Sequence, residues 1–281
     1  MTLFVNLRAG PYGSVCAPYV LEGDGTASPP GMTSVSWNAI PILAKGKNVL
    51  LAAHGFNVSY EDGLRSLSHL ETALEMRPGE LFLGVLWPGD WVIPAVNYPF
   101  EDKVASHGGV LLGDFCNRWL ASSQSISFLS HSLGARVILE AIKASKRPVR
   151  RACITAGAVN SGCLREEYRL AAGNCGQIRT LSSRQDLVLE FAYPPGDLLA
   201  DALDPDHPPF EAALGRGGPS GAFGATILPS EISDVIPYDH GDYFPPAHSV
   251  LPPPAPTDKW RRAVEFMASA FRGLRSRYSS Q

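Results

Sequence analysis

A chain of 281 residues is long enough for one large α/β domain or two small ones. Apolar residues make up 45% and charged residues 18%, and the net charge of -3 without a long basic run argues against nucleic acid as a partner. No apolar run approaches the roughly 18–20 residues that span a bilayer, and the N-terminus does not resemble a signal peptide, so we expect a cytoplasmic protein without a membrane span.

Apolar runs alternate with helical patterns along the chain. This predicts strands at residues 3–8, near 35–37, and at 48–53, 81–86, 126–129, 152–156, 177–181 and 232–237. Helices are expected at 60–76, 102–120, 135–142 and 258–272. Such alternation gives βαβ units, and therefore an α/β fold with a mostly parallel central sheet flanked by helices.

We expect residues 1–281 to form a single domain. An irregular stretch rich in proline and glycine lies before the last expected strand, and we interpret 193–230 as a loop or lid insertion. The sequence leaves the role of residues 1–45 open, because they could add edge strands, cover the site or join subunits. It also leaves the oligomeric state open.

Five cysteines are spread through the chain without a C-x-x-C pair, which argues against a structural zinc site. An odd number leaves at least one thiol free. Cys163 and Cys175 could form a disulfide, but free buried thiols fit a reducing compartment better.

The most informative stretch is SISFLSHSLGARVILE, residues 125–140. Its pattern predicts a strand, a very tight turn and a helix, with Ser132 at the apex. A turn of this kind exposes the serine hydroxyl to a base, and it needs small residues two before and two after the serine. Those residues are Ser130 and Gly134, where Ser130 departs mildly from the usual G-x-S-x-G pattern.

The functional residues of an open parallel sheet lie at the carboxyl ends of its strands. Those ends hold Ser132, then Asp186, then His240, which is the Ser, acid, His order of α/β-hydrolases. The chain resembles that superfamily, and within it a bacterial group of serine esterase/lipase-like hydrolases. The stretches that carry the resemblance are AAHGFNVSYED (52–62), VLWPGDW (85–91), LSHSLGARVILEAI (129–142), LSSRQDLVL (181–189) and DHGDYF (239–244).

The resemblance implies the α/β-hydrolase fold and a role for each matching residue. Ser132 would be the nucleophile, His240 its general base and then acid, and Asp186 the group that orients the imidazole. The backbone N–H groups of Phe56 and Leu133 would bind the oxyanion.

Other histidines remain alternatives to His240. His248 also follows the last expected strand, although DHGDYF matches the family's histidine segment better. We interpret His54 as a residue that anchors its loop, and we expect His131 to point away from the apex of the turn.

Other acids remain alternatives to Asp186, namely Glu190, Asp197 and Asp239. Asp186 could equally cap a short helix that begins at Leu187. The loop cluster Asp201, Asp204, Asp206 and His207 fits no metal-binding spacing, so we expect a solvated acidic loop there, no metal and no organic cofactor.

The sequence therefore predicts a carboxylesterase or lipase-like enzyme that acts on a small-molecule ester of short to medium chain length through an acyl-enzyme. Two alternatives stay open. The same triad could serve a thioesterase, an amidase or a peptidase, or the fold could be a binding module whose atypical turn at Ser130 is catalytically dead.

Overall fold

The structure, a computed structural model, describes residues 1–10, 14–90, 94–191, 212–221, 224–245 and 258–275, with residues 94–102 and 191 described by their backbone alone. Its strands are β1 (Thr2–Arg8), β2 (Val15–Asp24), β3 (Gly31–Ser34), β4 (Asn48–Ala53), β5 (Glu80–Leu86), β6 (Ser125–His131), β7 (Arg151–Thr155), β8 (Ile178–Ser182) and β9 (Ile227–Glu231). Its helices are α1 (Ala39–Ala44), α2 (Tyr60–Leu74), α3 (Pro94–Trp119), α4 (Gly134–Ala144), α5 (Arg169–Gly173), α6 (Leu187–Phe191), α8 (Leu214–Gly217), the 3₁₀ helix η1 (His240–Tyr243) and α9 (Asp258–Arg272).

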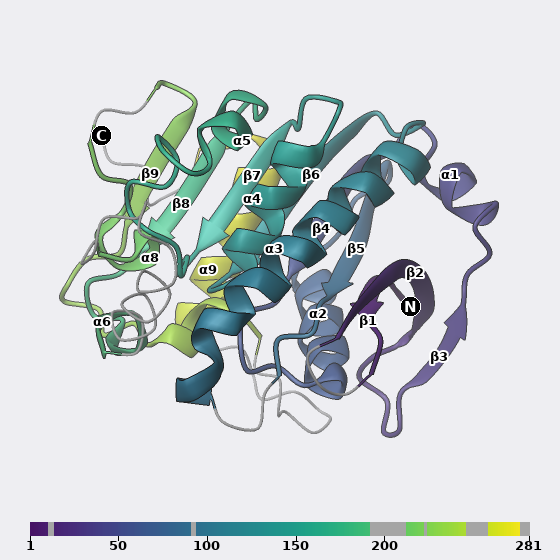
Figure 1. Ribbon diagram of the computed structural model, residues 1–281, viewed down its shortest axis with the longest axis horizontal. Helices are drawn as coiled ribbons and strands as arrows, with labels where there is room; N and C mark the ends of the chain where they lie inside the picture. Colours follow the sequence, from purple (N-terminus) through teal and green to yellow (C-terminus); the bar gives the residue numbers. More distant parts are fainter. Residues whose placement is uncertain (11–13, 91–93, 192–211, 222–223, 246–257, 276–281) are drawn as a thin grey trace.

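The described strands form one sheet in the order β3-β2-β1-β5-β4-β6-β7-β8-β9. The strands β1, β5, β4, β6, β7, β8 and β9 all run parallel to their neighbours in this order. Strands β2 and β3 are antiparallel additions at one edge. Helices α3 and α4 cover one face of the sheet, and α2 and α9 cover the other (Figure 1). The predicted α/β fold with a mostly parallel sheet is confirmed.

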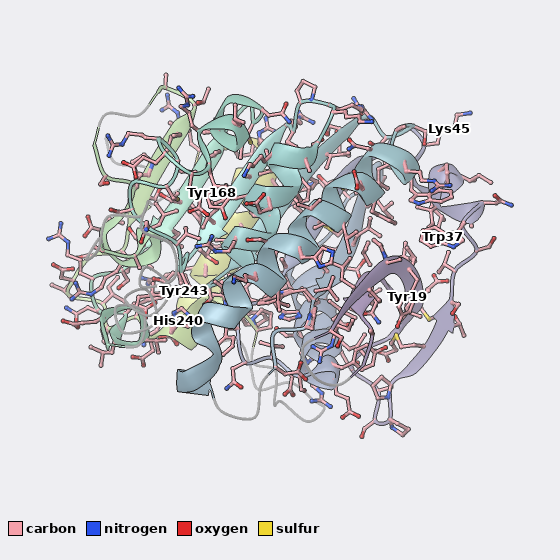
Figure 2. The ribbon with its side chains drawn as sticks, viewed as in Figure 1. Tyr19, Trp37, Lys45, Tyr168, His240 and Tyr243 are labelled. Carbon is pink, nitrogen blue, oxygen red and sulfur yellow. The ribbon has the colours of Figure 1, made fainter. Side chains whose placement is uncertain are left out.

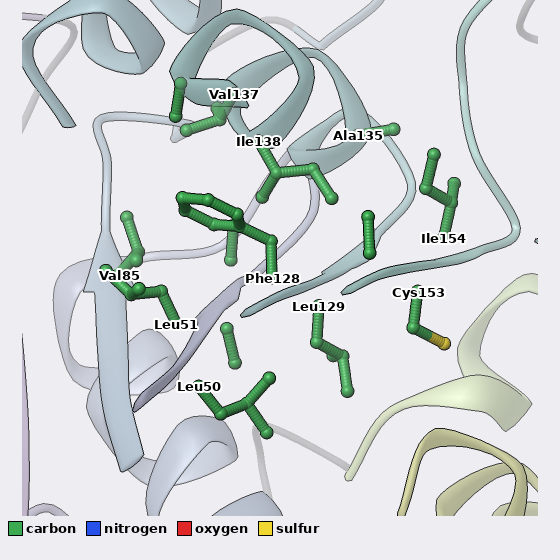
Figure 3. Packing of buried hydrophobic residues seen from close by; sticks show 14 of the residues in the cluster. Leu50, Leu51, Val85, Phe128, Leu129, Ala135, Val137, Ile138, Cys153 and Ile154 are labelled. Atoms are coloured by element: carbon green, nitrogen blue, oxygen red, sulfur yellow. The ribbon is translucent and has the colours of Figure 1, made fainter. Parts of the chain in front are cut away.

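Strand β6 shows why the central strands read as continuous apolar runs. Phe128 points towards Val137 and Ile138 of α4, while its neighbour Leu129 points to the opposite face beside Leu50 (Figure 3). All five side chains are at most 1% exposed. A strand buried on both faces needs apolar residues at successive positions, since successive side chains point to opposite sides.

Helix α2 has a clear start signal. The side chain of Ser59 accepts a hydrogen bond from the backbone N–H of Asp62, and Glu61 and Asp62 lie in the first turn. These acidic residues interact favourably with the positive end of the helix dipole. The buried face includes Leu64, Leu67 and Leu70, as the helical spacing predicted.

Some expected elements lie elsewhere in the structure. The last strand is β9 at Ile227–Glu231, not 232–237, where Ile232 is buried but Val235 is 87% exposed. Residues 35–37 form no strand, because β3 already ends at Ser34. Helix α3 begins at Pro94, eight residues before the predicted start, and Pro94 suits a first helical position, where its missing N–H would be unpaired.

Strand β2, helix α1 and the short helices α5, α6 and α8 were not predicted as elements, apart from the suggestion of a helix after Asp186. Residues 1–45 supply β1, β2, β3 and the whole of α1, so this segment extends the sheet. All five cysteines are free, and the possible bridge between Cys163 and Cys175 is absent. Most of the expected 193–230 insertion lies outside the described residues, at 192–211 and 222–223.

Candidate active site

The residue at the end of β6 has an unusual backbone conformation. Ser132 has a φ of +55°, in the left-handed region that side chains rarely adopt. Its N–H donates to the carbonyl of Thr155 at 3.1 Å, and its own carbonyl accepts from Ala135 at 3.0 Å and Ala158 at 3.1 Å. These bonds hold the sharp turn from β6 into α4 that the sequence predicted.

Gly134 is required at this turn because the neighbouring chain passes close by. A Cβ at residue 134 would lie 2.4 Å from the carbonyl oxygen of His54 and 2.9 Å from that of Ala53. Both contacts are to backbone, which cannot move aside as a side chain can. Ser130, in the other small-residue position, is fully buried in β6 between β4 and β7.

Three side chains far apart in the sequence meet at the carboxyl edge of the sheet. The Oγ of Ser132 lies 2.8 Å from Nε2 of His240, and Nδ1 of His240 lies 2.8 Å from Oδ2 of Asp186. A carboxylate oxygen only accepts, so Nδ1 carries the proton and Nε2 presents its lone pair to the serine hydroxyl. Figure 2 shows His240 beside Tyr243 at the lower edge of the sheet, away from Lys45 at the upper edge.

Asp186 is fully buried and uses both carboxyl oxygens. Oδ1 accepts from the backbone N–H of Leu189 at 3.0 Å, and Oδ2 accepts from His240. Asp186 therefore both caps α6 and contacts the ring of His240.

The backbone around His240 is fixed from several sides. Asp239, the N-cap of η1, forms a capping box with Asp242, and the hydroxyl of Tyr238 donates to the carbonyl of Lys259 in α9. Nε2 of His131 lies 2.8 Å from the carbonyl oxygen of His240, which can only accept, so His131 donates. The His131 ring also lies against the ring of His240, with 4.7 Å between the ring centroids, so it faces the histidine of the candidate site.

The alternative site residues are engaged elsewhere or fall outside the description. Glu190 pairs with Arg216 at 3.0 Å, and Asp239 is part of the capping box. His248 and Asp197 lie outside the described residues, as does the acidic cluster at 201–207. Within the part of the chain that is described, no three His, Cys, Asp or Glu side chains are grouped so that they could hold a metal ion.

The loop after β4 lies directly against the turn at Ser132. A Cβ at Gly55 would lie 2.9 Å from Cβ of Ser132. Phe56 follows Gly55, and Leu133 is the residue before α4, so both belong to segments that adjoin the serine. Asn57 has a φ of +56°, a conformation that asparagine tolerates better than most residues.

A family model described as "Alpha/beta hydrolase of unknown function (DUF900)" matches residues 38–156. The match includes Phe56, Ser132 and Leu133 and ends before Asp186 and His240. The chain has the α/β-hydrolase fold. No curated protein sequence matches it.

Several solved esterases have a similar chain course at low sequence identity. An esterase from Pyrobaculum calidifontis is 12% identical, with 82% of this chain and 77% of that chain covered and a TM-score of 0.43. A carboxylesterase cloned from a metagenomic library is 10% identical (94% and 86% covered, TM-score 0.45). Carboxyl esterase 2 from the fungus Tuber melanosporum is 14% identical (96% and 91% covered, TM-score 0.42).

The strain at Ser132 of this α/β-hydrolase fold leads to a stability prediction. We expect Ser132→Gly to have a free energy of unfolding about 1 kcal/mol higher than Ser132→Ala, because glycine adopts a positive φ without steric cost. Both variants lack the hydroxyl, so lost hydrogen bonding affects them equally. Urea unfolding of the two variants measures the difference, and an alanine variant that is as stable as the glycine variant would contradict it.

A second prediction concerns the stability of the protein at acidic pH. His54 is 1% exposed, and burial, with a smaller effect of Arg8, lowers its pKa to about 3. Its Nδ1 donates to the carbonyl of Gly55 at 2.8 Å, and Nε2 accepts from the N–H of Trp87 at 3.4 Å, an arrangement that only the neutral ring can make. Protonation would therefore break the second bond.

Because the folded pKa of His54 is below the usual value near 6.5, the unfolded chain binds the proton first as pH falls. The stability that the neutral ring provides is complete above pH 6.5 and is lost between pH 6.5 and 3. From pH 7 to 5, the free energy of unfolding should fall by about 2 kcal/mol more in wild type than in His54→Gln. Urea unfolding at both pH values tests this, and equal losses would count against it.

Proposed function

We propose that this protein is a serine hydrolase that cleaves carboxylic esters through an acyl-enzyme on Ser132. The observation that carries the proposal is the continuous hydrogen-bonded run from Ser132 Oγ through the ring of His240 to Asp186. A serine hydroxyl is a weak nucleophile, and an adjacent base held in one tautomer by a carboxylate is what activates it.

Acylation follows from this arrangement. Oγ of Ser132 attacks the ester carbonyl carbon while Nε2 of His240 accepts the hydroxyl proton. The carbonyl oxygen becomes an oxyanion in the tetrahedral intermediate. When the intermediate collapses, the C–O bond to the alcohol breaks and His240 returns the proton to the departing alkoxide, leaving the acyl group on Ser132.

Deacylation repeats the sequence with water. His240 accepts a proton from a water molecule while the water oxygen attacks the acyl carbon. His240 then protonates Oγ of Ser132 as the carboxylic acid leaves. Asp186 keeps the imidazole in the required tautomer and stabilises the imidazolium that forms in each half-reaction.

The N–H groups of Phe56 and Leu133 are our proposed oxyanion donors. Leu133 directly precedes α4, so its N–H belongs to the positive end of that helix dipole. Phe56 comes from the loop whose Gly55 packs against Ser132. Donors already in place where charge develops stabilise the transition state, because nothing must reorganise during the reaction.

We further propose that residues 1–281 form one domain, because one cluster of buried apolar side chains extends from β1 to α9.

The proposed substrate is a small ester of short to medium acyl length. Within the described ranges, no helix is long and apolar enough to cross a membrane.

Hydrolysis of p-nitrophenyl acetate, butyrate and longer esters by wild type and His240→Ala tests the proposal. We expect turnover by wild type, with a preference among acyl lengths, and its loss in the variant. Activity that survives in His240→Ala but not in His248→Ala would move the base to the other histidine. Cleavage of thioesters or amides in preference to all these esters would keep the mechanism and change the substrate class. A wild type that cleaves none of them would favour a binding module.

A further inference from the structure

The first strand of the chain places an arginine at the edge of the sheet that holds the candidate site. β1 runs parallel to β5, β5 to β4, and β4 to β6, so the carboxyl ends of these four strands lie along one edge. Arg8 is the last residue of β1 and Ser132 follows the last residue of β6. The arginine is only 3% exposed, which is uncommon for a charged residue.

The buried guanidinium of Arg8 joins two loops. Nη1 donates to the carbonyl of Val58 at 3.3 Å and to that of Trp87 at 3.2 Å, while Nη2 lies 2.5 Å from Oδ1 of Asp90. Val58 belongs to the loop after β4, and Trp87 and Asp90 belong to the loop after β5. One planar group therefore satisfies acceptors from both loops, which the compact ammonium of a lysine would reach less completely.

The two loops also bind each other closely. The N–H of Asn57 donates to the carbonyl of Gly89 at 2.6 Å, and Nε1 of Trp87 donates to the carbonyl of His54 at 2.8 Å. A Cβ at Gly89 would lie 3.2 Å from the carbonyl oxygen of Gly55. Because the loops are hydrogen-bonded and closely packed, a displacement of one is transmitted to the other. Gly55 in turn lies so near the turn that a Cβ there would be 2.9 Å from Cβ of Ser132.

We propose that Arg8, paired with Asp90, is a positioning residue that holds the 54–58 loop, and with it the N–H of Phe56, at the distance from Ser132 that oxyanion binding needs. This inference rests on the proposed function of the site. The hydrogen bonds described for the Arg8 side chain are with Val58, Trp87 and Asp90. Arg8 acts through Val58 and Trp87, and it gives the N-terminal strand a part in catalysis.

The effect should appear in kcat more than in KM. An oxyanion donor stabilises charge that develops only in the transition state. Moving the donor therefore reduces the stabilisation of the transition state and leaves substrate binding largely intact. A misplacement of about 1 Å can cost on the order of 10²-fold in rate.

The chain offers a matched control in Arg272 of α9. Its guanidinium pairs with Glu80 at 2.9 Å and also donates to the carbonyls of Leu74 and Glu75, at 3.0 and 2.9 Å. It therefore makes the same kinds of contact as Arg8, a carboxylate and two carbonyls. Glu80 begins β5, so this pair lies at the opposite edge of the sheet from Ser132.

The experiment compares Arg8→Met and Arg8→Lys with Arg272→Met in steady-state hydrolysis of p-nitrophenyl butyrate. Hydrogen–deuterium exchange is followed in parallel over residues 54–58. We expect kcat to fall about 10- to 100-fold in Arg8→Met, with KM within about threefold of wild type. Exchange over 54–58 should quicken in both Arg8 variants, while Arg272→Met keeps wild-type kcat and exchange there.

If Arg8→Met does not fold, Arg8→Lys and Asp90→Asn decide the kinetic comparison. The proposal is overturned if the Arg8 variants match Arg272→Met in both kcat and exchange, or if only KM changes. A wild type without hydrolytic activity would refute the proposed function alone. In that case hydrogen–deuterium exchange tests the positioning role of Arg8. Faster exchange over 54–58 in the Arg8 variants would support that role, and unchanged exchange would refute it.

Discussion

Replacing Ser132 by alanine should abolish ester hydrolysis, with kcat/KM falling on the order of 10⁴- to 10⁶-fold. The substitution removes only the hydroxyl group, whose oxygen lies 2.8 Å from Nε2 of His240. The variant keeps the turn, the loop at Gly55 and the proposed oxyanion donors. Any remaining rate above that of water would come from binding and from those donors.

Ser130 supplies the control for this substitution. It lies two residues earlier, in β6, and is fully buried, and its hydroxyl has no hydrogen-bond partner among the residues that the structure describes. Ser130→Ala should therefore fold and retain activity close to that of wild type. Equal losses in Ser130→Ala and Ser132→Ala would show that the strand end, not the Ser132 hydroxyl, matters, and an active Ser132→Ala would refute the nucleophile.

The second large effect is expected for Asp186→Asn, with kcat reduced on the order of 10⁴-fold. Asparagine can keep the cap on α6, because its carbonyl oxygen can still accept from Leu189. Its amide would then face Nδ1 of His240 with donor protons. The ring must respond by moving its own proton to Nε2, and a protonated Nε2 cannot take the proton of Ser132.

The pattern of losses separates the roles of the acid. Asp186→Asn should be stable but slow, whereas Asp186→Ala should be slow and also less stable, since it loses the cap. Thermal unfolding together with kcat measures both. Glu190→Gln is the control, because Glu190 lies four residues on, was the competing acid, and pairs with Arg216. A larger loss in Glu190→Gln than in Asp186→Asn would assign the acid to Glu190.

The central sheet was predictable because its strands are buried on both faces. The runs at 48–53 and 81–86 leave few polar positions and read as strands without reference to their partners. β2 was missed because it mixes buried and exposed positions around Pro18. β9 was missed for a similar reason, since ILPSE contains Pro229, which an edge strand tolerates, while the more apolar ISDVIP read better.

Ser132 and Asp186 became candidates because each follows the end of a strand, β6 and β8. His240 became one through the local pattern DHGDYF, although it lies well beyond the end of β9. Arg8 has no such pattern. Its partner Asp90 lies 82 residues away, and only the parallel pairing of β1 with β5 brings the two together. His131 is similar, because its contact with the carbonyl of His240 spans 109 residues and involves backbone that any residue could supply.

The central claim is that Ser132 carries the acyl group, and the most direct measurement is the site of covalent attachment of a fluorophosphonate. The wild-type protein would be labelled, digested and sequenced by tandem mass spectrometry. We predict one adduct, on Ser132, with labelling strongly slowed in His240→Ala because the base no longer activates the hydroxyl. An adduct on another residue, or no adduct on a folded wild-type protein, would contradict the account.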